Sequence, residues 1–238
     1  MRQHLKLAFE FIERIEVEQD QQRLIGAYQD FIERLSFRAF CAGRFTLRRN
    51  DETLEILGTT WPEEWNRRYA ERSYNRADPV AAAFHETAVP FDWARLRARA
   101  EGLPARIMDE GRDFGFCDGF GFGIHHRGPF ISGISLGSQK VELSPEEARG
   151  LHLASIFFEA KLEQLHFHDS AAKRVLSKRE RECLSWVAEG KGDWEISQIL
   201  TVSEITVTHY VKNAMKKLNA TKRTQAVVVA ILNKEIIV

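Results

Sequence analysis

Residues 203–218 read Ser203-Glu-Ile-Thr-Val-Thr-His-Tyr-Val-Lys-Asn-Ala-Met-Lys-Lys-Leu218, and this stretch decides the fold of the C-terminal part of the chain. Apolar residues recur in it at helical spacing and predict one buried stripe: Val207, Val211, Ala214, Met215 and Leu218. The opposite face carries polar and basic residues: Thr206, His209, Tyr210, Lys212, Asn213, Lys216 and Lys217. Such side chains read base edges and contact phosphates, so we interpret this face as DNA-binding. A solvated helix face is the alternative.

The surrounding residues predict a helix-turn-helix. Helices are expected over residues 177–189, 193–200, 203–218 and 222–234. Ser177 and Glu180 form a capping box at the start of the first helix, and Asp193 is the expected cap of the second. The turn Thr201-Val-Ser203 then has the length found between the two helices of this motif. We therefore predict an all-α, four-helix helix-turn-helix domain over residues 174–238.

The N-terminal part of the chain mixes helical and strand patterns. Helices are expected over residues 4–36, 62–69, 79–86, 99–114 and 144–166, and strands over residues 39–48, 55–59, 119–126 and 130–136. The polar turns 49–52 and 127–129 join neighbouring strands and indicate an antiparallel sheet. Periodicity breaks over residues 166–173, where we place the linker. The order predicts an α+β domain over residues 1–168, whose antiparallel sheet has helices on both faces.

Composition fits a protein of two domains. The 238 residues are 44% hydrophobic and 29% charged, and no apolar run approaches the ~20 residues that a membrane-spanning helix needs. Three scattered cysteines, Cys41, Cys117 and Cys183, favour a reducing cytoplasm. From residue 171 onward the chain has 12 basic and 7 acidic residues, a net charge of +5, against −5 for the rest. A basic module joined to an acidic one is typical of a nucleic-acid-binding protein with a second domain.

Three segments carry a resemblance. They are Leu176-Ser-Lys-Arg-Glu180-Arg-Glu-Cys-Leu184-Ser-Trp-Val-Ala-Glu-Gly190, Glu195-Ile-Ser-Gln-Ile-Leu200 and Thr206 to Leu218. Together they resemble the LuxR-type DNA-binding domain, over nearly all of residues 174–232. The resemblance implies that the last helix, with Ala226, Val229 and Ala230, pairs two such domains. A two-fold homodimer of this kind would bind a palindromic element in double-stranded DNA.

A second resemblance lies in the N-terminal part. Trp61-Pro-Glu-Glu-Trp65-Asn-Arg-Arg-Tyr69 is followed by Asp78-Pro79-Val80 and by Pro90-Phe-Asp-Trp93. This spacing resembles the N-acyl-homoserine-lactone-binding domain of LuxR-type quorum-sensing receptors. The resemblance implies a transcriptional regulator that is not an enzyme, that takes this lactone as its ligand and no cofactor, and that has RNA polymerase as a further partner.

The chemistry of these residue types suits such a ligand. The indole of Trp65 only donates and suits the lactone carbonyl, whereas the carboxylate of Asp78 only accepts and suits the amide N–H. Tyr69 and Ser135 can donate to the amide carbonyl, and Trp93 offers a flat wall to the lactone ring. Taken singly, these residues have a structural interpretation, as an aromatic core and a helix cap at Asp78. Gly119-Phe-Gly-Phe-Gly123 leaves one strand face bare, either for a ligand or for a packed helix.

Other motifs are weaker. Gly133-Ile-Ser135-Leu-Gly137 has the G-x-S-x-G spacing of a hydrolase nucleophile, but no helix is expected directly after it. His125-His126 and His166-Phe-His168 lack further ligands at metal-binding spacing, so no metal site is predicted. Two alternatives to a lactone-dependent regulator stay open. One is a LuxR-type regulator that answers another small molecule or none, and the other is an antiactivator that sequesters a partner protein. The sequence leaves the acyl chain, the promoter, and whether the ligand activates or relieves DNA binding undetermined.

Overall fold

The computed structural model describes residues 3–48, 51–126, 130–171, 175–233 and 235–237. The chain forms two compact units, Met1–His168 and Asp169–Val238. Within the described ranges, no helix is both long and apolar enough to cross a membrane. The turn predicted at 127–129, and residues 49 and 50 of the turn predicted at 49–52, lie outside the described residues.

The N-terminal unit is built on a five-stranded sheet in which every pairing is antiparallel. Its spatial order is β2 (Asp51–Thr59), β1 (Ala39–Arg48), β5 (Phe130–Ser138), β4 (Asp118–His125) and β3 (Phe91–Asp92). Central strand β5 aligns Ser135 with Cys41 of β1 and with Gly121 of β4. Residues directly opposite each other on paired strands lie on the same face of the sheet, so these three residues share one face.

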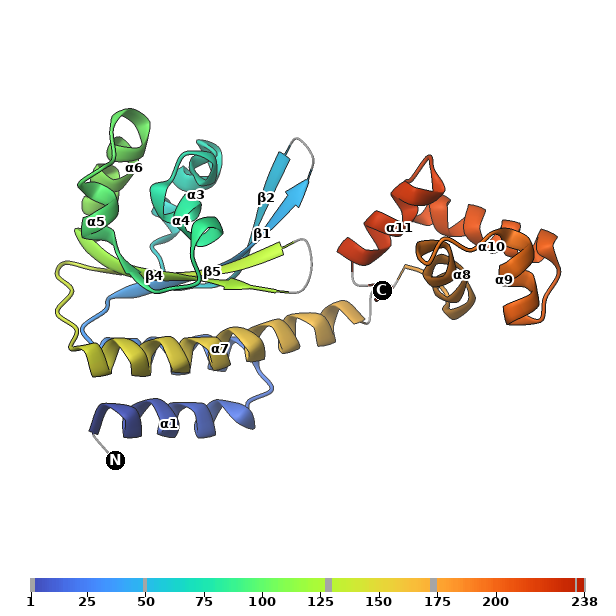
Figure 1. Cartoon of the computed structure of the whole chain (residues 1–238). Helices are drawn as coiled ribbons and strands as arrows, with labels where there is room; N and C mark the ends of the chain where they lie inside the picture. Colours follow the sequence, from blue (N-terminus) through green and yellow to red (C-terminus); the bar gives the residue numbers. More distant parts are fainter. Residues whose placement is uncertain (1–2, 49–50, 127–129, 172–174, 234, 238) are drawn as a thin grey trace. The chain divides into compact units, whose positions relative to one another are not determined.

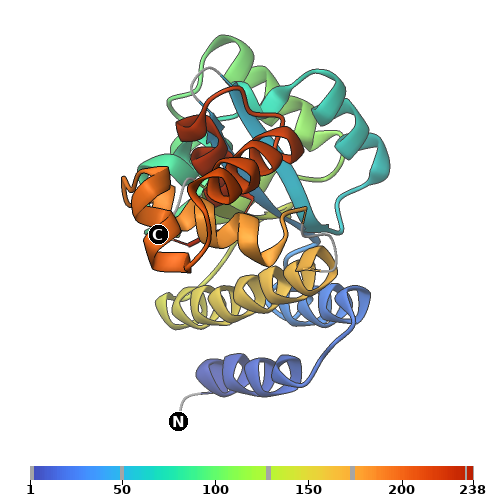
Figure 2. The same ribbon diagram turned by 90° about the vertical axis from the view of Figure 1, so that its right-hand side faces the viewer.

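One face of the sheet is covered by α2 (Gln21–Glu33) and α7 (Pro145–Ala171), and α1 (Gln3–Glu16) lies outside these two helices (Figures 1 and 2). The core on this side is apolar and aromatic. Tyr28 stacks on Phe158 with ring centroids 3.9 Å apart. Its hydroxyl lies 2.5 Å from Ser155 Oγ of α7, so even the polar end of this ring has a partner.

Charged side chains also join α7 to this face of the sheet. Ser132 Oγ of β5 donates to Glu159 Oε1 at 2.6 Å, and His126 Nε2 lies 3.0 Å from the same oxygen. Arg44 of β1 lies 3.7 Å from Glu163 of α7. A buried carboxylate is costly unless it is hydrogen-bonded, and here Glu159 has two partners.

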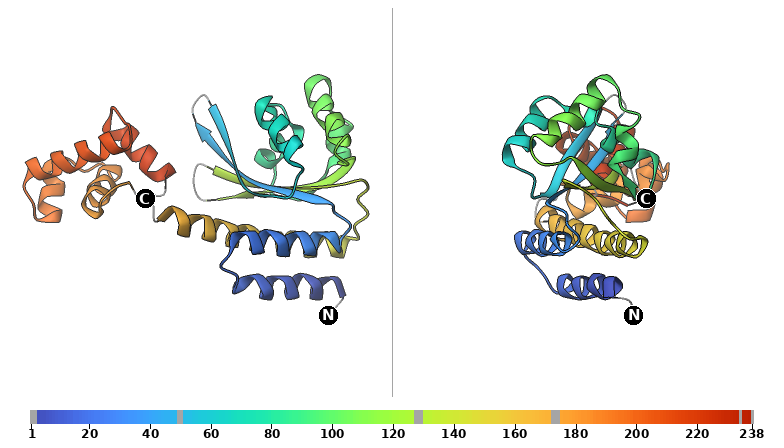
Figure 3. Two further views of the ribbon diagram at one scale, coloured as in Figure 1. Left: turned by 180° about the vertical axis from the view of Figure 1, so that it is seen from behind. Right: turned by 90° about the vertical axis from the view of Figure 1, so that its left-hand side faces the viewer.

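The opposite face is covered by short helices, seen from behind in Figure 3. They are α3 (Glu63–Glu71), the 3-10 turn η1 (Tyr74–Arg76), α4 (Pro79–Glu86), α5 (Trp93–Arg97) and α6 (Gly102–Arg112). Glycines of β4 and β5 allow their close approach. A Cβ at Gly119 would overlap the ring of Trp93, and one at Gly133 would overlap the ring of Phe84. The bare strand face therefore serves helix packing.

The C-terminal unit contains α8 (Lys178–Ala188), α9 (Asp193–Leu200), α10 (Glu204–Lys217) and α11 (Arg223–Leu232). Ser177 caps α8 in a capping box with Glu180, and Ser203 caps α10 by accepting from Thr206 N. Thr201 and Asn219 adopt positive φ values of 54° and 51°, and reverse the chain at the ends of α9 and α10.

The predicted fold class is confirmed: an antiparallel sheet with helices on both faces precedes a four-helix domain. Some boundaries differ. α7 continues to Ala171, through part of the predicted linker. Gly192, not Asp193, is the N-cap of α9, because Asp193 is already helical. The predicted helix over 99–114 is shorter, as α6, and β3 and α5 precede it, because the contact of Phe91 and Asp92 with β4 could not be seen in a two-residue pattern.

Candidate functional site

Two small cavities lie between the sheet and the short helices, and they share one wall. Each encloses about 30 Å³. The first is mainly aliphatic and phenylalanine-lined, with walls that include Phe45, Leu54, Ile56 and Phe84. The second is mainly aromatic and lies beside Trp65, Trp93, Ile107, Met108 and Phe116. We call them the aliphatic cavity and the aromatic cavity. The residues common to both are Trp61, Asp78, Val80 and Ser135.

Asp78 is the acidic group of the shared wall. It caps α4 by accepting from Val80 N at 2.8 Å through Oδ1, and it accepts from the Tyr69 hydroxyl at 2.7 Å through Oδ2. Its side chain is buried. Burial raises its pKa, although the bonds from Tyr69 and Val80 act in the opposite direction. Each carboxylate oxygen can accept a second hydrogen bond, so Asp78 can still receive a donor from a ligand.

Donor groups without partners surround this carboxylate. The indole Nε1 atoms of Trp61, Trp65 and Trp93, and Oγ of Ser135, are buried and make no hydrogen bond among the described residues. Buried polar groups are nearly always hydrogen-bonded, and one left unpaired costs about 1–3 kcal/mol. Four such groups around two adjoining cavities therefore indicate a site for a molecule with several acceptor oxygens.

All five residues predicted to bind a ligand line these cavities. Trp65 and Trp93 line the aromatic cavity, Tyr69 the aliphatic cavity, and Asp78 and Ser135 both. The Tyr69 hydroxyl donates to Asp78 Oδ2 at 2.7 Å in this structure, and its predicted contact with a ligand carbonyl stays a prediction. Its observed contact positions the carboxylate.

Trp61 was not among the predicted ligand residues. It belongs to the shared wall and its Nε1 has no partner among the described residues. The sequence feature that could have identified Trp61 as a site residue is its spacing, because Trp61, Trp65 and Tyr69 recur every four residues. Trp61 precedes the first residue of α3, Glu63, so helical periodicity alone did not place it on the same side as Trp65.

Ser135 lies in the interior of β5, not at a turn from strand to helix. The G-x-S-x-G spacing is therefore part of a strand, with its glycines against Phe84 and Phe116. The described residues contain no group of three or more histidine, cysteine or acidic side chains that could hold a metal ion.

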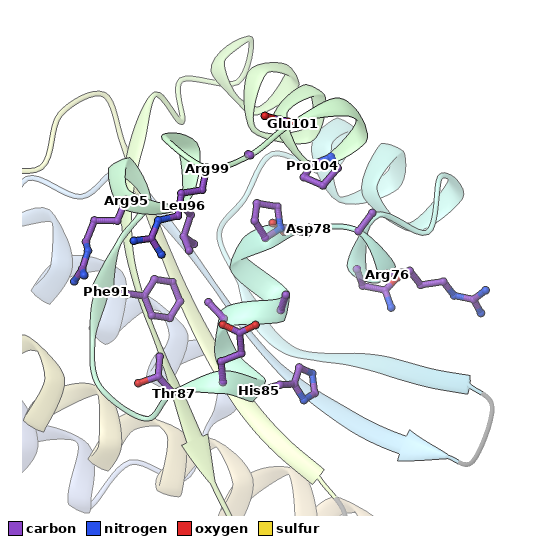
Figure 4. A pocket seen from close by; sticks show the side chains of 17 residues that line it. Arg76, Asp78, His85, Thr87, Phe91, Arg95, Leu96, Arg99, Glu101 and Pro104 are labelled. Atoms are coloured by element: carbon purple, nitrogen blue, oxygen red, sulfur yellow. The ribbon is translucent and has the colours of Figure 1, made fainter.

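A larger, open pocket of about 870 Å³ lies on the outer side of α4 (Figure 4). Side chains of α4, α5 and the start of α6 surround it, with Arg76, Arg95, Arg99 and Glu101 among them. Its lining mixes charged side chains with alanine, proline, leucine and phenylalanine, whereas the unpartnered indole and serine donors lie at the two buried cavities. The unpartnered donors, and not the cavity volume, make the buried cavities the better candidate for a ligand with acceptor oxygens.

The residues predicted to bind DNA lie on α10. His209, Lys212 and Lys216 are exposed, and Thr206, Tyr210 and Asn213 are partly exposed. Of the predicted buried stripe, Val207, Val211, Ala214 and Leu218 are buried and Met215 is partly buried. The helix thus presents a polar face from its first turn to its last.

Lys217, at the end of this face, already has a partner. Its Nζ donates to Glu180 Oε2 at 2.8 Å, and Glu180 also accepts from Ser177 N at 2.7 Å. Burial alone would raise the pKa of Glu180, but the bonds from Lys217 and Ser177 lower it overall. Lys217 therefore ties α10 to α8, in addition to any contact with DNA.

Polar contacts also hold α9 against α10. Thr208 Oγ1 donates to Asp193 Oδ2 at 2.5 Å, and Arg223 of α11 lies 2.7 Å from Asp193 Oδ1. Asp193 thus joins three of the four helices. These contacts hold α9, α10 and α11 together around the turn between α9 and α10.

The chain was compared with known proteins. Residues 20–162 match the model of the autoinducer-binding domain, and residues 174–230 match that of the luxR family of bacterial regulatory proteins. The chain belongs to the LuxR family of quorum-sensing transcriptional regulators. It has this family's autoinducer-binding and DNA-binding domains, and LuxR-family proteins are regulators and not enzymes. The resemblance inferred from the sequence is thereby confirmed.

Relatives of this LuxR-family chain have similar lengths. The transcriptional activator protein BjaR1 of Bradyrhizobium diazoefficiens is 33% identical over 181 residues, 75% of each chain. The quorum-sensing-dependent transcriptional regulator RpaR of Rhodopseudomonas palustris is 30% identical over 226 residues, 94% of this chain and 92% of RpaR. The fold is similar to that of Escherichia coli SdiA, with a TM-score of 0.77, 20% identity, and 97% and 98% of the two chains covered.

Proposed function

We propose that this regulator binds an N-acyl-homoserine lactone at the two adjoining cavities, whose walls move apart to admit it because each cavity encloses only about 30 Å³, and that the ligand controls its binding to DNA. The carrying observation is the set of unpartnered indole and hydroxyl donors around the buried carboxylate of Asp78. An acyl-homoserine lactone offers the matching groups, which are two carbonyl acceptors, one amide N–H and an apolar chain.

The residues of the shared wall support one orientation of the proposed ligand. Asp78 accepts the amide N–H, and Trp61 and Ser135 donate to the amide carbonyl. The lactone ring then occupies the aromatic cavity, where Trp65 donates to its carbonyl and Trp93 packs against the ring. The acyl chain extends into the aliphatic cavity, where each buried methylene adds ~0.8 kcal/mol.

Ligand binding would stabilise the N-terminal unit, which we assign to residues 1–168. A ligand that binds only the folded state shifts unfolding by mass action. The N-terminal unit then supports a homodimer in the cytoplasm. Its DNA-binding domains, residues 174–238, read a palindromic element through α10, pair through α11, and act on RNA polymerase.

The test uses the full chain and a panel of acyl-homoserine lactones. We expect one lactone to raise the melting temperature of the N-terminal unit by several degrees and to change the affinity for a DNA fragment that contains the palindrome. Asp78→Ala is expected to abolish both effects. Trp65→Phe keeps an aromatic side chain, smaller than the indole, but loses the Nε1 donor, and is expected to weaken binding by roughly tenfold. Asp109→Ala, at an exposed ion pair with Arg97, is the matched control and should change neither.

Each alternative function has its own outcome. A melting temperature that no lactone moves, with DNA binding intact, would indicate a regulator that answers another molecule or none. Failure to bind any DNA, with or without lactone, would indicate an antiactivator. A lactone response that Asp78→Ala leaves intact would refute the assignment of this site.

A further inference from the structure

Asn66 is the polar residue at the acyl end of the site. It lies on α3 and lines the aliphatic cavity with Leu54 and Ile56, but it does not line the aromatic cavity. The same three residues also line a second, open pocket of about 350 Å³ between β2 and α3. Asn66 therefore lies where the aliphatic cavity approaches the open pocket.

The orientation of the Asn66 amide is fixed by its neighbour. Its Nδ2 donates to the carbonyl oxygen of Trp61 at 3.1 Å, and a carbonyl oxygen can only accept. The side-chain oxygen Oδ1 therefore points away from Trp61. This oxygen is buried and has no hydrogen-bond partner among the described residues.

The other groups that line this part of the aliphatic cavity do not donate a hydrogen bond to Asn66 Oδ1. Leu54, Ile56 and Phe45 are apolar, and the Tyr69 hydroxyl already donates to Asp78. Ser135 and Trp61 belong to the shared wall, where the proposed ligand places its amide. A buried acceptor without a partner is costly, so a donor on the ligand would be strongly favoured at this position.

We propose that Asn66 selects lactones whose acyl group carries a hydroxyl. This inference rests on the proposed lactone binding and names its ligand class more closely. The hydroxyl donates to Asn66 Oδ1. An oxo group at the same carbon places one acceptor against another and is rejected, and an unsubstituted chain leaves Oδ1 unpaired. A site that can hydrogen-bond a substituent discriminates more strongly than an apolar one.

The experiment compares matched lactones by titration of the full-length chain. One set has the same chain with hydrogen, hydroxyl or oxo at its third carbon, and a second set has a phenyl or a 4-hydroxyphenyl group in the acyl part. We expect the hydroxylated member of at least one set to bind roughly three- to tenfold more tightly than its unsubstituted partner. The oxo compound is expected to bind least tightly. The set that shows the gain tells whether the hydroxyl is aliphatic or phenolic.

Two variants separate this role from a structural one. Asn66→Leu removes the acceptor at similar volume, so the affinity ratio of hydroxylated to unsubstituted lactone should fall to about one, whatever the stability of the variant. Asn75→Leu makes the same change at a residue of the open pockets that does not line either buried cavity, and should keep the ratio of the unaltered chain.

The outcomes distinguish the two proposals. Lactone binding that depends on Asp78 but shows no preference for a hydroxyl overturns the role of Asn66 alone. A hydroxyl preference that survives Asn66→Leu also overturns it. If no lactone binds at all, the proposed function fails, and this inference fails with it.

Discussion

Buried polar groups on the two faces of the N-terminal sheet differ in their hydrogen bonding. On the face toward α7, Ser132 donates to Glu159 at 2.6 Å and Tyr28 lies 2.5 Å from Ser155. On the face toward the short helices, Ser135 Oγ is buried without a partner among the described residues. Ser132 and Ser135 belong to the same strand, three residues apart, so the difference does not come from the strand itself.

The two layers of the N-terminal unit therefore differ in whether their buried polar groups have hydrogen-bond partners within the chain. The layer between the sheet and α7 satisfies Ser132 and Tyr28 from within the chain. In the layer that contains Trp61, Trp65 and Asp78, the two indole Nε1 donors are buried without a partner among the described residues. We expect the first layer to determine the stability of the unit without ligand, and the second to determine its response to ligand.

The largest effect on stability is expected from the glycines on the sheet face that packs against the short helices. Gly119→Ala places a methyl group against the ring of Trp93 and the carbonyl oxygen of Leu136, so the N-terminal unit should lose about 1–3 kcal/mol. Gly26→Ala on α2 is the control. Its methyl group meets nothing within 4 Å, and helix propensity favours the change by roughly 0.5–1 kcal/mol. Calorimetry that found Gly119→Ala neutral would show that this face is loosely packed.

The paired serines of β5 test the contrast directly. Ser132→Ala removes the bond to Glu159 and should cost about 1–2 kcal/mol of stability, with lactone affinity unchanged. Ser135→Ala should change stability by less than about 0.5 kcal/mol but weaken lactone binding roughly three- to tenfold. Chemical denaturation and ligand titration of both variants give the four values. The same pattern of loss in the two variants would contradict the contrast.

The smallest effect is expected at Asp78 without ligand. Burial raises its pKa in the folded protein, so the folded state binds a proton more tightly than the unfolded state does. This contribution is fully present below the unfolded pKa and is lost as the pH rises from there toward the raised folded pKa. At neutral pH the folded chain must bury the ionised Asp78 carboxylate, whereas Asp78→Asn carries no charge. The unliganded variant should therefore melt slightly above the unaltered chain at neutral pH. An unliganded Asp78→Asn chain that melts lower at neutral pH would show that the bonds of the carboxylate outweigh its burial.

Local signals predicted much of this structure. The capping box at Ser177 and Glu180, the alternation along the strands and the stripe of α10 depend on neighbours within a few residues, and each is present. The lengths of α7 and α6 depend on packing partners far away in the sequence. The periodicity of residues 166–171 is poor, yet the helix continues through them.

The candidate site was predictable in its members but not in their pairings. Trp65, Asp78 and Ser135, which the family resemblance and their residue chemistry had indicated, line the cavities. That the Tyr69 hydroxyl donates to Asp78, or that Asn66 keeps a buried oxygen unpaired, depends on the angle between α3 and α4. A sequence pattern does not fix such an angle.

The glycine-lined face of β4 and β5 has a consequence for genetics. A screen for mutants that no longer respond to the signal should recover two classes, at separate positions. Changes at Gly119, Gly133 or Gly137 put a side chain into Trp93, Phe84 or Phe116, and such mutants are expected to accumulate less folded protein than the parent. Changes at Trp65 or Asp78 will leave a normal amount of protein that has lost its sensitivity. Immunoblots of the recovered mutants would sort them before any ligand is tested.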